Sequence, residues 1–166
     1  MDLERLHDAH ATAVRAYALR RTDPATADDV CAEVWAVAWR RLDRIPEDAL
    51  PWLFGVARRV LANHRRGERR RAALRGRLVE RGFGWAGSVP PPAIPSDRHL
   101  AEALATLKPA DREALLLVAW EGLEPARAAA ALRVSPATFA VRLHRARKRL
   151  AAQLDRATVS TQEVTS

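Results

Sequence analysis

The sequence has few of the features that stabilise disulfide-rich or membrane-spanning proteins. It has one cysteine among 166 residues, which excludes an intramolecular disulfide and fits a reducing compartment. It has no run of about 18 apolar residues, so we expect no transmembrane helix and no membrane insertion. Its first ten residues, MDLERLHDAH, are charged and have no apolar centre. We therefore expect no signal peptide and a cytoplasmic location.

The common signatures of enzymes are also missing. The sequence has no phosphate-binding Walker loop, no glycine fingerprint for dinucleotides and no zinc-ligand spacing. His7 and His10 lie three residues apart on a predicted helix, but no further ligand completes a metal site, so packing is the favoured interpretation. We expect no catalytic residue, no cofactor and no metal, and an enzyme is the least favoured class.

The charge balance points to an anionic partner. Lysine and arginine total 28 residues against 20 acidic ones, which gives a net charge of +8. Nucleic acid is the first candidate for such a basic chain and an acidic membrane surface the second. Because much of the 48% hydrophobic content is alanine, two small cores fit better than one thick core.

The distribution of glycine and proline divides the chain. Residues 1–75 and 98–155 have helical periodicity, and no stretch is a convincing strand. Between them, residues 76–97 contain GFGWAGSVPPPAIPSD, a composition typical of linkers. We therefore predict an all-α protein of two small helical domains joined by a flexible Gly/Pro-rich linker. Residues 156–166 are polar and are predicted to form a disordered tail.

The first domain pairs an acidic helix with a basic one. In the helix after Asp23, three acidic residues lie off the apolar stripe, and a third helix begins near Pro51. This third helix carries a basic cluster in which Glu68 is the only acidic residue. Such an imbalance favours binding to a polyanion over a helix face that is merely solvated. That cluster consists of Arg58, Arg59, Arg65, Arg66, Arg69, Arg70, Arg71, Arg75 and Arg77. Trp52 either stacks on an unpaired base or fills a core.

The second domain ends in a helix-turn-helix pattern. A short helix, Pro125 to Leu132, is followed by the break RVS and by a long basic helix that Ser135 can cap. On that helix Phe139, Leu143 and Leu150 share one side and are predicted to pack inward. The basic residues could merely solvate a helix end, but the preceding helix and turn favour DNA in the major groove.

Three motifs in this order resemble the bacterial RNA polymerase sigma factors of the two-domain extracytoplasmic-function (ECF) group. They are ADDVCAEVWAVAWRRLD, PWLFGVARRVLANHRR and LKPADREALLLVAWEGL, the last continuing to AAAALRVSPATFAVRLHRARKRL. The resemblance covers both domains, residues 1–75 as region 2 and 98–155 as region 4. It implies a two-domain subunit that directs core RNA polymerase to promoters and assists their opening.

The resemblance also implies partners and contact residues. The partners are core RNA polymerase, at the largest-subunit coiled coil and the flap, and promoter DNA, with an anti-sigma factor as a further candidate. The implied core-polymerase-binding residues are Asp28, Asp29, Glu33, Trp39 and Arg40. The implied residues for the −10 element are Pro51, Trp52, Arg58, Arg59, Asn63 and Arg66. Those for the −35 element are Ser135, Thr138, Val141, Arg142, His144, Arg145 and Lys148.

The sequence departs from the family pattern at several of these surfaces. The unusual residues are Ala32, Arg59, Arg127, Arg133, Ala137, Ala140 and Val141. Ala140 and Val141 stand where polar base-reading residues are frequent, and their methyl groups cannot form bidentate hydrogen bonds. Arg133 and Ala137 stand where glycine is common around the turn.

Two other functions remain open at this point. A stand-alone helix-turn-helix regulator would bind its operator without polymerase, often as a dimer. A protein that sequesters or regulates polymerase would bind the enzyme without starting transcription at a promoter.

Overall fold

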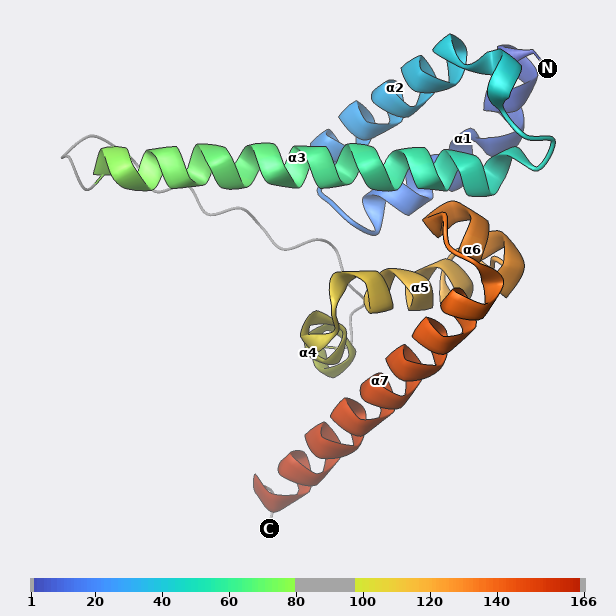
Figure 1. Cartoon of the computed structure of the whole chain (residues 1–166). Helices are drawn as coiled ribbons and strands as arrows, with labels where there is room; N and C mark the ends of the chain where they lie inside the picture. The colour runs from blue at the N-terminus through green and yellow to red at the C-terminus, as the bar shows by residue number, and fades with distance from the viewer. Residues whose placement is uncertain (1, 80–97, 165–166) are drawn as a thin grey trace. The chain divides into compact units, whose positions relative to one another are not determined.

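The computed structural model describes the backbone of residues 2–79 and 98–164. The chain divides into two compact units, residues 1–93 and 94–166, and each is described by itself. In the described part every regular element is a helix, seven α-helices and one short 3-10 helix (Figure 1). The prediction of an all-α fold is confirmed.

The first unit contains three α-helices. α1 spans Leu3–Leu19, α2 spans Pro24–Arg40, the 3-10 helix η1 spans Leu42–Arg44 and α3 spans Ala49–Val79. Asp23 caps α2, because its side chain accepts a hydrogen bond of 3.0 Å from the Thr26 backbone N–H, and Pro24 occupies the first turn. The same hydrogen bond lowers the pKa of the Asp23 carboxyl.

An aromatic stack and a buried arginine connect α1 to α3. The rings of Tyr17 and Phe54 stack with centroids 4.7 Å apart, and both side chains are buried. Arg21 is only 5% exposed; its guanidinium lies 3.5 Å from the Tyr17 ring centroid and donates to the Tyr17 carbonyl oxygen. From α3, Arg65 Nη2 donates to the Arg21 carbonyl oxygen at 2.9 Å. The end of α1 is therefore held by polar contacts as well as apolar packing.

The second unit contains the other four helices. α4 spans Arg98–Thr106, α5 Pro109–Ala119, α6 Pro125–Leu132 and α7 Pro136–Val164. Their core is built from leucine and alanine around the fully buried Phe139. α7 packs against α4, α5 and α6, so the long basic helix also organises this core.

Two predicted irregular segments are partly helical, which corrects the sequence-based boundaries. α3 continues to Val79, so residues 76–79 are helix and not linker. Gly76 does not end the helix, because one glycine among good helix formers such as arginine, alanine and leucine destabilises a helix by only about 1 kcal/mol. α7 continues to Val164, so the prediction of a disordered tail is wrong for residues 156–164. No glycine or proline follows Pro136 to end that helix. The rest of the predicted linker, with Trp85, lies outside the described residues.

Candidate functional site

A side-chain cap sets the start of α7. The Thr138 backbone N–H donates to Ser135 Oγ at 3.1 Å, and the two hydroxyl oxygens lie 2.8 Å apart. Pro136 stands at the first helical position, where its missing N–H costs nothing. Ser135 and Thr138, both predicted for the −35 element, are exposed and fix the beginning of this helix.

Packing determines which side of α7 faces outward. Phe139, Leu143 and Ala146 are buried, which confirms the predicted inward side for Phe139 and Leu143, whereas Leu150 is only half-buried. The opposite side carries exposed residues of the predicted −35 set, with Arg142 half-buried at its margin. The exposed ones are Val141, His144, Arg145 and Lys148.

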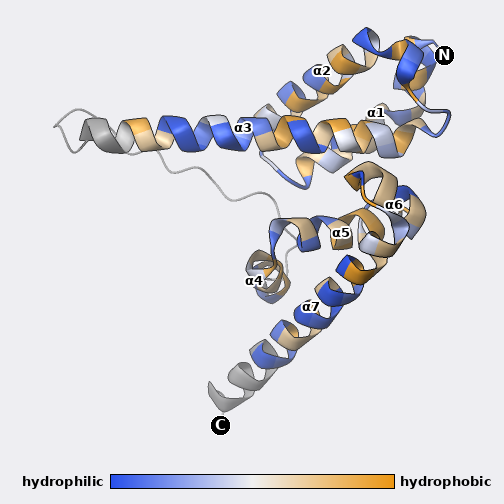
Figure 2. Cartoon of the chain, viewed as in Figure 1, coloured by the Kyte–Doolittle hydropathy of each residue, from blue (hydrophilic) through white to orange (hydrophobic). Residues whose placement is uncertain are grey.

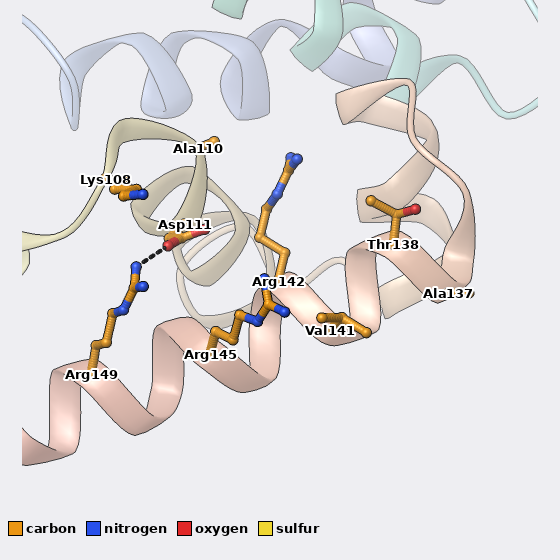
Figure 3. A pocket seen from close by; sticks show the side chains of 9 residues that line it. All are labelled: Lys108, Ala110, Asp111, Ala137, Thr138, Val141, Arg142, Arg145 and Arg149. Carbon is orange, nitrogen blue, oxygen red and sulfur yellow. Dashed lines mark hydrogen bonds and ion pairs between the residues drawn. The ribbon is translucent and has the colours of Figure 1, made fainter.

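A shallow groove runs between the beginning of α5 and α7 (Figure 3). Its volume is about 610 Å³, and four of its nine lining residues are cationic: Lys108, Arg142, Arg145 and Arg149. The one acidic residue, Asp111, accepts a hydrogen bond of 2.8 Å from Arg149 Nη1, and this ion pair balances the charge of Arg149 and leaves three cations without an acidic partner in the groove. The groove therefore offers positive charge along one side of α7, which suits a phosphate backbone.

The turn between α6 and α7 depends on an unusual backbone conformation. Arg133 caps α6 with φ 57° and ψ 44°, in the left-handed region that glycine prefers. The backbone N–H of Val134 donates to the Ala129 carbonyl oxygen at 3.1 Å and completes the cap. The predicted helix-turn-helix is present, with an arginine where glycine would be unstrained.

The acidic side of α2 faces solvent. Its buried stripe consists of Ala27, Val30, Val34 and Ala38. The five residues predicted to bind polymerase are exposed, and Trp39 is 72% exposed. Asp28 pairs with Arg15 at 3.2 Å, and Glu33 Oε1 lies 2.9 Å from His64 Nε2 of α3. Two of the carboxylates are thus held by neighbouring helices.

The predicted −10 residues are distributed between the surface and the core of α3. Asn63 and Arg66 are exposed and hydrogen-bonded to each other. Trp52, Arg58 and Arg59 are half-buried. Trp52 is therefore neither fully buried in the core nor fully displayed.

Pro51 stands apart from the other predicted −10 residues because it is buried. It lies in the first turn of α3, where a missing backbone N–H is tolerated. Its position makes it part of the start of the helix and not of the displayed surface.

Sequence reasoning missed the residues that connect the helices. Arg21, which the sequence analysis did not single out, is buried against Tyr17, and Arg65 of the basic cluster donates to its carbonyl oxygen at the end of α1. His64 was not recognised as the partner of Glu33. Only the i, i+4 spacing of Tyr17 and Arg21 hinted at the first contact; contacts between helices have no local signal.

His7, considered above for a metal pair, packs instead against Trp35, with ring centroids 4.8 Å apart. Among the described residues no group of three or more His, Cys, Asp or Glu side chains is arranged to hold a metal ion. Nor is any helix in the described ranges both long and apolar enough to cross a membrane. Cys31 is half-buried, and burial together with the negative charge of Asp28 raises the pKa of its thiol.

Comparison with known families decides the identity of the two units. The model for Sigma-70 region 2 matches residues 6–71, and the model for Sigma-70 region 4 matches residues 98–150. The ECF RNA polymerase sigma factor SigL of Mycobacterium tuberculosis is 34% identical over 144 residues, covering 84% of this chain and 81% of that protein. The chain belongs to the ECF sigma factors.

Solved structures agree with this assignment. CnrH in complex with the cytosolic domain of CnrY is 26% identical, with a TM-score of 0.61 over 92% of this chain and 87% of that one. The sigma factor RpoE of Bartonella quintana, in complex with NepR, shares the fold at 23% identity, with a TM-score of 0.65 over 92% and 96% of the two chains. This sigma factor is a regulatory subunit for transcription initiation, and its partners are core RNA polymerase and promoter DNA.

Proposed function

We propose that this sigma factor directs core polymerase to promoters by reading the −35 element with α7 and the −10 element with α3. The observation that carries the proposal is the two-sided character of α7. Phe139, Leu143 and Ala146 anchor one side in the core, while the other side presents a row of exposed residues beginning at a capped N-terminus. That is the arrangement with which a helix-turn-helix enters the major groove.

The −35 surface contains two kinds of contact. Arg142 and Arg145 line the cationic groove, and Lys148 is exposed on the outer side of α7, so these three side chains would hold phosphates. Val141 is 50% exposed and has no hydrogen-bonding group, so its methyl groups suit the C5-methyl of thymine. His144 is the first exposed side chain past the cap turn that can hydrogen-bond to a base edge.

The −10 surface lies on α3. Asn63 and Arg66 are exposed beside each other and can donate to bases or phosphates. Trp52 and Arg59 lie on the same side by helical spacing, and a half-buried tryptophan still has a face on which an unpaired base can stack. Capture of a flipped base would offset part of the unstacking cost of promoter opening, a few kcal/mol.

The polymerase-binding surface is the acidic side of α2. Asp28, Asp29 and Glu33 would face basic side chains of the largest-subunit coiled coil, with Trp39 supplying apolar contact area. The second unit would contact the flap. A protein that binds core polymerase and promoter DNA works where the chromosome is, so a cytoplasmic location belongs to the proposal.

Regulation by an anti-sigma factor is also part of the proposal. Its support is CnrH, a relative with 26% identity whose structure contains the cytosolic domain of CnrY. A protein that covered α2 or α7 would compete with polymerase or with DNA.

Gel filtration with core polymerase, followed by transcription, tests the function. The purified chain is run alone and with core enzyme, and the co-eluting complex is then used for run-off transcription from genomic fragments. We expect co-elution and discrete transcripts, which would also identify the promoter. Operator binding by the free chain without co-elution would instead establish a stand-alone regulator. Co-elution without promoter-dependent transcripts would establish a protein that sequesters polymerase.

A further inference from the structure

The groove between α5 and α7 contains a single carboxylate, which is largely buried. Asp111 stands in the first turn of α5, and its side chain is only 13% exposed, whereas that of its partner Arg149 is 49% exposed. Arg149 Nη1 donates to Asp111 Oδ2 at 2.8 Å (Figure 3). The other charged residues that line the groove are all cationic. The carboxylate is therefore the less accessible member of the pair.

Arg149 is the last member of a row of side chains on α7. Thr138, Arg142, Arg145 and Arg149 follow at spacings of four, three and four residues, so they lie along one side of the helix, and all four line the groove. Hydrophilic and hydrophobic residues alternate along α7 (Figure 2), as expected for a helix with one packed and one displayed side. Among the described residues the side chains of Arg142 and Arg145 make no hydrogen bond or ion pair. The row therefore ends at a cation that is already paired.

The burial of Asp111 decides whether Arg149 can leave this pair for a DNA phosphate. A phosphate offers an arginine a partner of similar strength, so the exchange depends on what happens to the carboxylate. An exposed carboxylate that loses its cation is solvated by water, but a largely buried one keeps an uncompensated charge. Because Asp111 is the buried member, the exchange is unfavourable, and Arg149 stays paired when DNA is bound.

We propose that Asp111 is a positioning residue that holds Arg149 away from DNA and thereby limits how strongly the second unit binds DNA of any sequence. The inference rests on the proposed function, in which the other arginines of the groove hold phosphates. Phosphate contacts carry no sequence information, so each additional one tightens binding to every DNA site. The limit matters here because the side chains of Ala140 and Val141 supply no hydrogen bond for base readout.

An ion pair that only fastened α5 to α7 would behave differently. Its loss would loosen the groove and weaken DNA binding, whereas the release of Arg149 to a phosphate strengthens it. The direction of the change in DNA affinity therefore separates the two roles.

The test uses variants of the full-length protein and a mixed-sequence DNA duplex, with binding followed by fluorescence anisotropy over a series of salt concentrations. Asp111→Asn removes the carboxylate charge and keeps the shape of the side chain. Asp8→Asn is the matched control at an exposed position of α1, a helix with no proposed DNA contact. Arg149→Gln removes the arginine alone, and Asp111→Asn/Arg149→Gln removes both members of the pair. Arg145→Gln removes a cation of the row that has no acidic partner.

Asp111→Asn should raise the DNA affinity roughly three- to tenfold at about 0.1 M salt and steepen the slope of log affinity against log salt by about 1, because one more arginine contacts a phosphate. Asp8→Asn should leave the slope near the wild-type value. The double variant should return the slope to the wild-type value. Arg149→Gln alone should leave the slope unchanged, because the wild-type Arg149 holds no phosphate.

An unchanged or lower affinity of Asp111→Asn overturns the proposal. A fall of the slope by about 1 in Arg149→Gln also overturns it, because Arg149 would then already contact DNA. Thermal unfolding is measured for each variant, and a loss of both stability and affinity in Asp111→Asn assigns the pair to packing alone. If Asp111→Asn does not fold, the slope of Arg149→Gln decides by itself.

Arg145→Gln separates this proposal from the function on which it rests. It should lower the slope by about 1. If it does so while Asp111→Asn has no effect, the proposal for Asp111 fails alone. If Arg145→Gln also has no effect, the groove does not bind DNA, and the phosphate contacts proposed for α7 fail with it.

Discussion

The two longest helices, α3 and α7, have similar architecture but are connected to their surroundings differently. They contain 31 and 29 residues, and both use their N-terminal part for the core. On α3, His64 bonds to Glu33 and Arg65 to the Arg21 carbonyl oxygen. On α7, Arg149 pairs with Asp111 of α5, but among the described residues the side chains of Arg142, His144, Arg145 and Lys148 make no hydrogen bond or ion pair.

The basic side chains of α3 and α7 therefore have different roles in the same chain. On α3, several basic and polar side chains also hold the helices of the first unit together, so substitutions there affect both fold and binding. On α7, apart from Arg149, the packing side and the displayed side are separate. Substitutions of Val141, His144, Arg145 or Lys148 should therefore report binding without a change in stability.

The largest effect should come from removing the buried anchor of α7. Phe139→Ala deletes a fully buried ring, which should destabilise the second unit by about 3–5 kcal/mol. Because this small unit has a leucine and alanine core, we expect it to unfold while the first unit stays folded. Urea unfolding measures this, followed by circular dichroism and, in a background with the other four tryptophans replaced by phenylalanine, by the fluorescence of Trp120. A loss below about 1 kcal/mol would mean that α7 does not depend on Phe139.

Charge reversal on α2 should give the next largest effect. Asp29→Lys/Glu33→Lys should weaken core-polymerase binding at least about tenfold, which corresponds to about 1.4 kcal/mol, because two exposed carboxylates become cations. Glu4→Lys/Asp8→Lys is the matched control on α1. Binding is measured by titrating labelled chain with core enzyme. Undiminished co-purification of the α2 variant would remove the polymerase contact from this face.

The two left-handed backbone positions of the second unit should respond in opposite directions. Gly122 has φ 65° and open space around an added Cβ, so Gly122→Ala should cost about 1 kcal/mol for backbone conformation alone. Arg133→Gly relieves the same strain and should stabilise the unit by a few tenths to about 1 kcal/mol. Thermal unfolding checks both. Destabilisation by Arg133→Gly would show that the arginine side chain contributes more than its conformation costs.

The smallest effect should appear at a single base. If Val141 contacts a thymine methyl, replacing that thymine by uracil in the −35 element should weaken holoenzyme binding by about 0.8 kcal/mol, about fourfold. Scanning uracil through the element in a competition assay finds the position. Val141→Ala should abolish the sensitivity to that substitution, and a variant that remains equally sensitive would exclude Val141 as the reader.

The sequence predicts the helices of this protein better than it predicts where they end and which side chains connect them. The Asp23 and Ser135 caps and the inward side of Phe139 and Leu143 follow from local spacing, and the structure confirms them. The helix ends at Val79 and Val164 were missed, because composition typical of linkers and tails does not prevent a helix from propagating.

The contact residues show the same division. Most of them are exposed, but Pro51 is buried, and four others, Trp52, Arg58, Arg59 and Arg142, are half-buried. The burial of Arg21 and the partners of Glu33 and Arg65 were not predictable, because they are set by how helices cross and not by any local pattern. Their contacts with DNA and polymerase stay predictions until measured.

The bond between Glu33 and His64 has a consequence for thermodynamic linkage. It joins the face proposed for polymerase to the helix proposed for the −10 element, with Nε2 and Oε1 2.9 Å apart. A partner cation that withdrew Glu33 from this bond would change the environment of His64, next to Asn63. Coupling between two binding sites is reciprocal, so DNA bound on α3 would alter the affinity of α2 for polymerase by the same factor.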